Sequence, residues 1–226
     1  MTGSWPGDRA DIEEREDERL EEEDHVHEVP LDEEPLLEDE AEPEADADER
    51  PQLRTAGEHA EGELDIPDEV TLLEGVADGK RRSVAIVAAR FNGEITNRLL
   101  QSALDELDDA GVRPEAITLM PVPGAFELPL AAMALAKTRR YACIVALGCV
   151  IRGETPHFEY VASEAASGLQ LAALETGVPV AFGVLTVDTI EQAEARVEKG
   201  AEAARTALGM ADAFAQLRAS AAAATR

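Results

Sequence analysis

One histidine in this chain lies where an imidazole can do chemistry. The segment GCVIRGETPHFEY (148–160) leads from an apolar run into a helical pattern, and His157 is the only histidine beyond the acidic first third. Thr155 suits a helix N-cap and Pro156 the first helical position, so His157 falls in the first turn. There the positive helix end disfavours imidazolium, and a neutral imidazole can relay protons. The sequence therefore predicts His157 as a proton-transfer residue.

The same turn offers chemistry for an anion. Exposed N–H groups at a helix N-terminus, here from Gly153 to Thr155, form a pocket that suits a phosphate. The alternative is structural, because RGETP could be only a glycine-containing turn and His157 a surface histidine. Both interpretations stay open on these residues alone.

The elements that must position these residues alternate along the chain. From residue 68 on, apolar, β-branched runs typical of buried parallel strands are followed by segments with helical spacing. This predicts an α/β protein with right-handed crossovers, a three-layer α/β/α fold with a flavodoxin-like four-stranded parallel sheet and a short N-terminal edge strand (70–74). The predicted strands are 83–89, 116–122, 141–151 and 178–186, and the predicted helical segments are 93–111, 125–140, 156–177 and 188–217.

Candidate side chains follow several of these strands. Ligands of open parallel sheets bind at the carboxyl ends of the strands, so residues that follow different strands can meet there. Each candidate has a structural alternative: Phe91 could cap the core, and Glu127 could be a carboxylate that the helix dipole favours. The side chains expected to converge at this edge are Phe91, Phe126, Glu127, Thr155 and His157, with Phe182 near the middle of the fourth strand.

The first 67 residues form an acidic segment. They hold 27 Asp/Glu and 5 Lys/Arg, a net of −22, whereas residues 68–226 hold 21 and 15, a net of −6. Apolar residues are too few there to offset an ordering entropy of roughly 1–2 kcal/mol per residue, so disorder is predicted. Such a segment should not bind nucleic acid or an anionic membrane. It could keep assemblies apart, attract a basic partner, or be solvated without any partner.

Other sequence features indicate the cellular compartment and the number of folded domains. We find no pattern of a targeting signal and no run of about 18 uncharged apolar residues that could span a membrane, so a cytoplasmic protein is expected. Cys143 and Cys149 lie six residues apart in one predicted strand, about 20 Å and too far for a disulfide. Both are expected to be buried thiols in a reducing compartment. About 160 residues remain, enough for one domain with its own core.

Four motifs, in order along the chain, resemble the 6,7-dimethyl-8-ribityllumazine synthase family of riboflavin biosynthesis. The resemblance covers residues 70–218. It implies a transferase that condenses 5-amino-6-(D-ribitylamino)uracil with 3,4-dihydroxy-2-butanone 4-phosphate, releasing phosphate and water, with no metal and no organic cofactor. The motifs are ARFN (89–92), PVPGAFELP (121–129), ALGCVIRGETPHFEYV (146–161) and GVPVAFGVLTVDTIEQAEAR (177–196).

The resemblance also implies a role for each matched residue. Phe91 would stack on the pyrimidine, and His157 would transfer protons. Ala125, Phe126 and Glu127 would line the ribityl site, while Cys149, Val150 and Ile151 would read the pyrimidine edge through main-chain groups. Glu154 and Thr155 would form the phosphate loop, and Phe182, Arg196 and Lys199 would complete the substrate site, with Phe182 and Arg196 supplied by a neighbouring subunit.

The chain departs from the family pattern after Arg196. Family members have a glycine-rich loop of the type AGxKAGNKG, whereas this chain reads RVEKGAEAAR (196–205) and is several residues shorter, so the last two helices could fuse. The resemblance implies a pentamer with shared active sites, or a hollow icosahedral shell of pentamers. Two rival interpretations are a scaffold on the same fold whose acidic segment binds a partner, and an archaeal-type riboflavin synthase, which the GETPH loop fits less well.

Overall fold

The computed structural model describes residues 64–67 and 69–224. The chain divides at Gly62, and the described residues belong to the unit Glu63–Arg226. The predicted disorder of the acidic segment falls almost entirely outside the described residues and stays a prediction.

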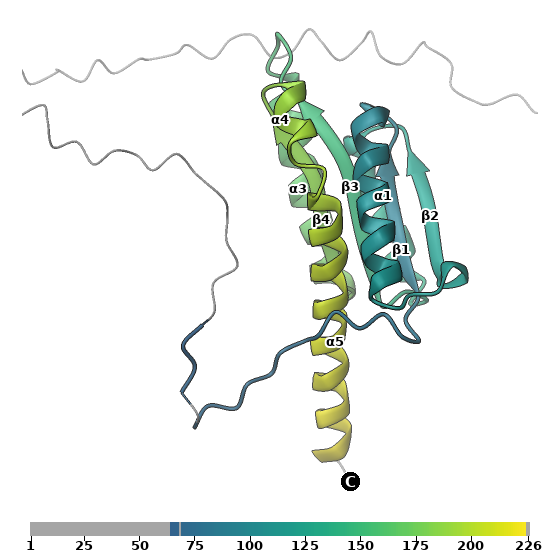
Figure 1. Cartoon of the computed structure of the whole chain (residues 1–226), viewed down its shortest axis with the longest axis vertical. Helices are drawn as coiled ribbons and strands as arrows, with labels where there is room; N and C mark the ends of the chain where they lie inside the picture. The colour runs from purple at the N-terminus through teal and green to yellow at the C-terminus, as the bar shows by residue number, and fades with distance from the viewer. Residues whose placement is uncertain (1–63, 68, 225–226) are drawn as a thin grey trace, which may run out of the picture. The chain divides into compact units, whose positions relative to one another are not determined.

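A four-stranded sheet forms the centre of the folded region (Figure 1). Its strands lie in the order β2-β1-β3-β4, and every neighbouring pair is parallel. The predicted parallel sheet is confirmed, and the strand bounds differ from the predicted ones by no more than two residues. The strands are β1 (Val84–Ala89), β2 (Ile117–Val122), β3 (Cys143–Ile151) and β4 (Val180–Val187).

Helices cover both faces of this sheet. In β1, Val84, Ile86 and Ala88 pack in one core cluster, whereas the alternate residues Ala85, Val87 and Ala89 pack in another. Because both faces of the strand are buried, its sequence is a continuous apolar run without polar alternation. The first face is covered by α1 (Gly93–Asp109) and α5 (Lys199–Ala224), and the second by α2 (Leu128–Lys137) and α3 (His157–Thr176) (Figure 1).

Two helical segments differ from the predicted ones. The segment 125–140 begins as a 3-10 helix, η2 (Ala125–Glu127), before α2, because the Glu127 side chain folds back onto the Gly124 amide. Residues 188–217 form two helices, α4 (Ile190–Glu194) and α5, so these helices do not fuse. The Thr189 hydroxyl accepts a hydrogen bond from the Gln192 amide and starts α4. One further 3-10 turn, η1 (Pro114–Ala116), precedes β2.

The short edge strand predicted over 70–74 does not form. Residues 71–79 are irregular, and their backbone groups bond to side chains of α5. The Val76 amide donates to Asp212 Oδ2 at 3.1 Å, and Gln216 Nε2 donates to the Glu74 carbonyl at 2.9 Å. Arg82 then pairs with the same Asp212 carboxylate at 2.6 Å. These bonds hold the segment against α5 without a neighbouring strand.

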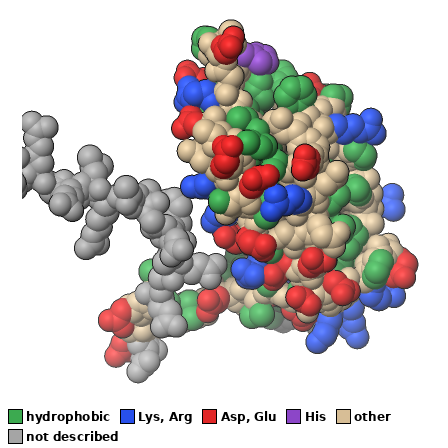
Figure 2. Space-filling model, turned by 45° about the horizontal axis from the view of Figure 1, so that its top comes forward, with side chains coloured by type: hydrophobic (Ala, Val, Ile, Leu, Met, Phe, Trp, Pro, Cys, Tyr) green, Lys and Arg blue, Asp and Glu red, His purple; other side chains and the backbone are tan. Residues whose placement is uncertain are grey.

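Charges of both signs are interspersed over the face of the folded region that Figure 2 shows. This agrees with the modest net charge of −6 counted for residues 68–226. Within the described residues, no helix has the length and the apolar character needed to cross a bilayer.

Candidate active site

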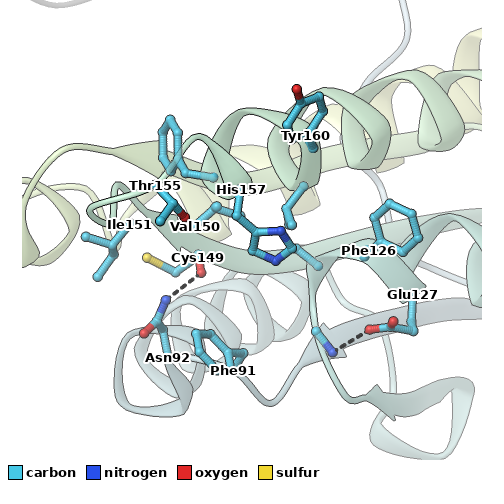
Figure 3. Close-up of a pocket in the computed structure, with 15 residues that line it drawn as sticks. Phe91, Asn92, Phe126, Glu127, Cys149, Val150, Ile151, Thr155, His157 and Tyr160 are labelled. Carbon is cyan, nitrogen blue, oxygen red and sulfur yellow. Dashed lines mark hydrogen bonds between the residues drawn. The ribbon is translucent and has the colours of Figure 1, made fainter.

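The topology of the sheet opens a crevice between β1 and β3. The chain moves outward from β1 to β2 on one side and from β3 to β4 on the other, so the loops after β1 and β3 diverge. A cavity of about 500 Å³ lies there. It is lined by Phe91, Asn92, Gly124, Ala125, Phe126, Glu127, Cys149, Val150, Ile151, Gly153, Thr155, His157, Phe158, Tyr160 and Val161 (Figure 3).

His157 enters this cavity from the first residue of α3. Its imidazole points into the group of labelled side chains, on the same cavity as Phe91 and Glu127 (Figure 3). The predicted cap is wrong by one position: Pro156 is the N-cap, and no side chain caps the helix. Thr155 therefore lines the cavity without bonding back to α3. The cause is the backbone of Pro156, which already closes the turn by accepting from the Glu159 amide at 2.9 Å.

The β1–α1 loop forms the opposite wall of the cavity. Asn92 has the left-handed backbone conformation (φ 53°), which asparagine tolerates better than most residues. Its side-chain Nδ2 donates to the Cys149 carbonyl at 2.9 Å, and the Phe91 amide donates to the Pro123 carbonyl at 3.1 Å. These bonds tie the loop to the segments after β2 and at the end of β3. Phe91 is thereby held 72% exposed, with its ring free to receive a planar ligand.

Glu127 supplies a carboxylate to a third wall. One of its oxygens, Oε2, accepts from the Gly124 amide at 2.8 Å, which fixes the side chain relative to the turn (Figure 3). Ala125 is buried beneath this turn, and Phe126 remains 57% exposed beside it. The wall therefore combines an aromatic face with an acceptor that can bind hydroxyl groups.

Comparison with known proteins shows the family of the chain. Residues 81–215, more than half of the chain, match the sequence profile of the family described as 6,7-dimethyl-8-ribityllumazine synthase. A curated 6,7-dimethyl-8-ribityllumazine synthase of Yersinia pestis (strain Pestoides F) is 53% identical over 147 residues, which are 62% of this chain and 94% of the relative. One of Yersinia pseudotuberculosis serotype O:1b (strain IP 31758) matches to the same extent. The chain belongs to the 6,7-dimethyl-8-ribityllumazine synthase family.

Most of the residues that the family resemblance singled out lie on this one cavity. Those from the loops after β1, β2 and β3 come together as expected from strand topology. Four others do not line it: Glu154, Phe182, Arg196 and Lys199. Glu154 is exposed in the turn before α3, and Phe182 is 47% exposed on β4.

Arg196 and Lys199 have local partners within their own chain. Arg196 Nη1 donates to the Gln192 carbonyl at 2.9 Å, and Lys199 Nζ pairs with Glu202 at 2.6 Å. Both pairs are short-range contacts, one at the turn after α4 and one in the first turn of α5. Nothing in these contacts directs either cation toward the cavity of the same chain.

Some cavity residues were missed from the sequence. Asn92 carried a usable signal, because asparagine is enriched among residues that adopt the left-handed conformation. Tyr160 carried another, since it lies three residues after His157 and so shares its helix face. Phe158 and Val161 gave no signal of their own, because apolar residues at helical spacing usually indicate core packing.

A charged cluster surrounds Arg152, which lies between the cavity-lining residues Ile151 and Gly153 in the chain. Arg152 Nε donates to Asp188 Oδ1 at 2.6 Å, and Nη1 donates to Glu159 Oε1 at 3.3 Å. Its guanidinium lies over the Phe158 ring, 4.6 Å from the centroid. The hydrogen bonds to Asp188 and then Glu159 raise the pKa of Arg152 above its usual range, so this side chain stays cationic.

Both cysteines are free and buried, as predicted. Burial raises the pKa of Cys143 to about 12 and that of Cys149 to about 11, so neither thiol ionises near neutral pH. At the cavity wall, the main-chain carbonyl of Cys149 accepts a hydrogen bond from Asn92 Nδ2. Across the described ranges, no group of three or more His, Cys, Asp or Glu residues is arranged to hold a metal ion.

Proposed function

We propose that this cavity is the active site in which the chain condenses 5-amino-6-(D-ribitylamino)uracil with 3,4-dihydroxy-2-butanone 4-phosphate. The products are 6,7-dimethyl-8-ribityllumazine, inorganic phosphate and water. The observation that carries the proposal is the presence of His157, Phe91 and Glu127 on one cavity, at the positions where the family motifs occur. The reaction is a step of riboflavin biosynthesis.

The pyrimidine substrate is assigned to the wall built by the β1–α1 loop and the end of β3. The exposed Phe91 ring offers a stacking surface for a planar heterocycle. Main-chain groups of Cys149, Val150 and Ile151 read the pyrimidine edge. The ribityl chain extends toward Ala125, Phe126 and Glu127, where its hydroxyls donate to the carboxylate, a charge-assisted hydrogen bond.

The phosphate substrate is assigned to the start of α3. Main-chain N–H groups around Glu154 and Thr155, together with the helix dipole, favour an anion there. This leaves the reacting carbonyl beside His157. Two C–N bonds form in the reaction, so protons leave the amine nitrogens while oxygens depart as water and phosphate. One imidazole that accepts and returns protons serves both needs, and holding the two reactants together supplies much of the acceleration.

The site is completed by a second copy of the chain. Phe182 is half exposed on β4, Arg196 is exposed in the turn between α4 and α5, and Lys199 begins α5; none of the three lines the cavity of its own chain. We assign Phe182 to the pyrimidine site and Arg196 to the phosphate of a neighbouring subunit, with Lys199 in a supporting position. A pentamer, alone or packed into a shell, provides that geometry.

Mixing the two substrates with the full-length chain tests the proposal. We expect lumazine absorbance to increase at the rate at which inorganic phosphate is released, one per lumazine, without added metal or cofactor. His157→Asn should lower kcat by roughly 100-fold or more, as expected when a general acid–base group is removed. Absence of lumazine formation by the wild-type chain would overturn the assignment.

A further inference from the structure

The turn that leads into His157 makes few hydrogen bonds of its own. In the described part of the chain, the amides of Gly153, Glu154 and Thr155 donate no backbone hydrogen bond. A Cβ on Gly153 would meet nothing within 4 Å, and no side chain caps α3. Something outside the turn must therefore fix where His157 points.

Arg152 joins this turn to two neighbouring elements. Its amide donates to the Val187 carbonyl at 2.9 Å, and its Nε donates to Asp188 Oδ1 at 2.6 Å, both at the end of β4. On the other side, its Nη1 donates to Glu159 Oε1 at 3.3 Å, and its planar group stacks on Phe158, both in the first turn of α3. The two residues that directly follow His157 on the helix are thus connected to the end of β4 by one side chain.

The β4 end of this linkage is itself held in place. The Asp188 amide donates to Gln192 Oε1 at 2.8 Å, and Gln192 in turn donates through its amide to the Thr189 hydroxyl. Asp188 is therefore seated on the first turn of α4. Arg152 consequently connects α3 to Asp188, a residue that is itself hydrogen-bonded to α4.

We propose that Arg152 is a positioning residue that clamps the His157 turn against the end of β4. The inference rests on the proposed function, because it assigns Arg152 an effect on the rate that acts through His157. Arg152 already has partners within its own chain: two carboxylates accept from its Nε and Nη1, and its guanidinium lies over the Phe158 ring.

The clamp needs an arginine and not merely a positive charge. A guanidinium offers donors in a planar fork together with a face that stacks on an aromatic ring, whereas a lysine ammonium is a compact point charge without that face. Lysine at this position could pair with one carboxylate but could not bridge both while covering Phe158. The substitution Arg152→Lys therefore separates geometry from charge.

The kinetic test compares Arg152→Ala, Arg152→Lys and the control Arg98→Ala in the full-length chain. Arg98 is a matched control because its side chain is 48% exposed, against 49% for Arg152, and it pairs with Glu194 at 3.9 Å away from the cavity. We expect kcat to fall about 10- to 100-fold in Arg152→Ala, since small misplacements of a catalytic group cost that much. Arg152→Lys should lose nearly as much, and Arg98→Ala should stay within about twofold of wild type. Restoration of kcat by lysine would contradict the clamp.

A double substitution shows whether Arg152 acts through His157. In a His157→Asn background, adding Arg152→Ala should change the residual rate by less than about twofold, because residues that act as a unit are non-additive. An undiminished loss in that background would mean that Arg152 affects turnover by another route and would overturn the proposal.

Hydrogen–deuterium exchange provides a readout that does not require turnover. Exchange of the amides in the first turns of α3, beginning with Glu159, which donates to the Pro156 carbonyl at 2.9 Å, should become several times faster in Arg152→Ala and remain unchanged in Arg98→Ala. Unchanged exchange in Arg152→Ala would contradict the clamp whatever the kinetics. If the wild-type chain forms no lumazine, the proposed function fails on its own, and the exchange experiment still decides the clamp.

Discussion

His157 is the residue on which the chemistry depends, and its position is set by backbone rather than by partners of its ring. It begins α3 directly after Pro156, on the same cavity as Phe91 and Glu127. An imidazole placed at the reacting carbonyl can exchange protons with both the amine and the departing oxygens. The role proposed for His157 therefore depends on where the chain leaves β3 and begins α3.

The pH dependence of the rate tests this role. The pH–rate profile of His157→Asn should differ in shape from that of the wild-type chain, since the variant lacks the group that accepts and returns protons. Measuring kcat from pH 5 to 9 for both proteins checks this. A profile of unchanged shape in the variant would remove His157 from the proton-transfer step.

Cys143 makes a second prediction at this scale, about stability. Its side chain is fully buried, and burial raises its pKa to about 12 in the folded chain, well above the value near 9 of an exposed thiol. The unfolded chain therefore loses this proton first, so the thiol's contribution to stability is full below pH 9 and is lost as the pH rises toward 12.

Denaturant unfolding at pH 7 to 11 measures this effect. The free energy of unfolding should fall above pH 9 with a slope of up to about 1.4 kcal/mol per pH unit from this thiol. Cys143→Ala should show a shallower slope, although it is less stable at pH 7. Equal slopes in the two proteins would contradict the buried-thiol account.

At the scale of elements, the start of α5 packs closely against α1. Gly200 lies so close to α1 that a Cβ there would be 2.1 Å from the Leu99 carbonyl oxygen. The Ser102 hydroxyl of α1 accepts from the Ala201 amide at 3.2 Å, so one helix caps the other. Arg205 adds a two-pronged pair to Glu106 with distances of 3.1 and 2.6 Å.

Two glycine substitutions in α5 test this packing. Gly200→Ala should destabilise the fold by about 1–3 kcal/mol, because the added methyl overpacks the helix contact. Gly209→Ala is the matched control, since its Cβ would meet only the Gly75 carbonyl oxygen at an ordinary 3.5 Å. It should be neutral or about 0.5–1 kcal/mol stabilising. Equal losses in thermal or denaturant unfolding would refute the close approach.

Sequence patterns predicted the sheet well because its strands are buried on both faces. A run such as VAIVAA (84–89) can lie only in the interior, and loops after such strands must meet at one edge. That reasoning brought Phe91, Glu127 and His157 together without reference to distances. The family resemblance added the roles, which geometry alone leaves open.

The misses have local physical causes. Thr155 was expected to cap α3, but the Pro156 carbonyl closes that turn. Residues 70–74 have strand-like composition. However, the Glu74 carbonyl and the Val76 amide bind Gln216 and Asp212, which are far away in sequence. The positioning role proposed for Arg152 could not be predicted from the sequence. It depends on contacts with residues 36 and 7 positions away, which no short motif records.

At the scale of the whole molecule, charge is concentrated in one part of the chain. Residues 1–67 hold 27 of the 48 acidic side chains, whereas the family profile matches residues 81–215. We propose that the acidic segment is dispensable for the reaction and acts, if at all, on assembly or on a basic partner.

Removal of residues 1–62 tests whether the acidic segment is dispensable for the reaction. The chain 63–226 should fold and keep kcat and both KM values within about twofold, because none of the cavity-lining residues precedes Phe91. Mass photometry of the two proteins at low and at high salt reports the assembly, since repulsion between acidic segments is screened by salt. A large loss of kcat in the shortened chain would show that the segment takes part in the site.

The central claim is that the pyrimidine substrate lies in the cavity between the loops after β1 and β3. An experimental structure of the full-length chain with bound 5-amino-6-(D-ribitylamino)uracil measures this directly. The ring should stack on Phe91, with its ribityl chain directed to Glu127 and its 5-amino group facing His157. A ligand bound elsewhere, or one in this cavity whose amino group faces away from His157, would contradict the account.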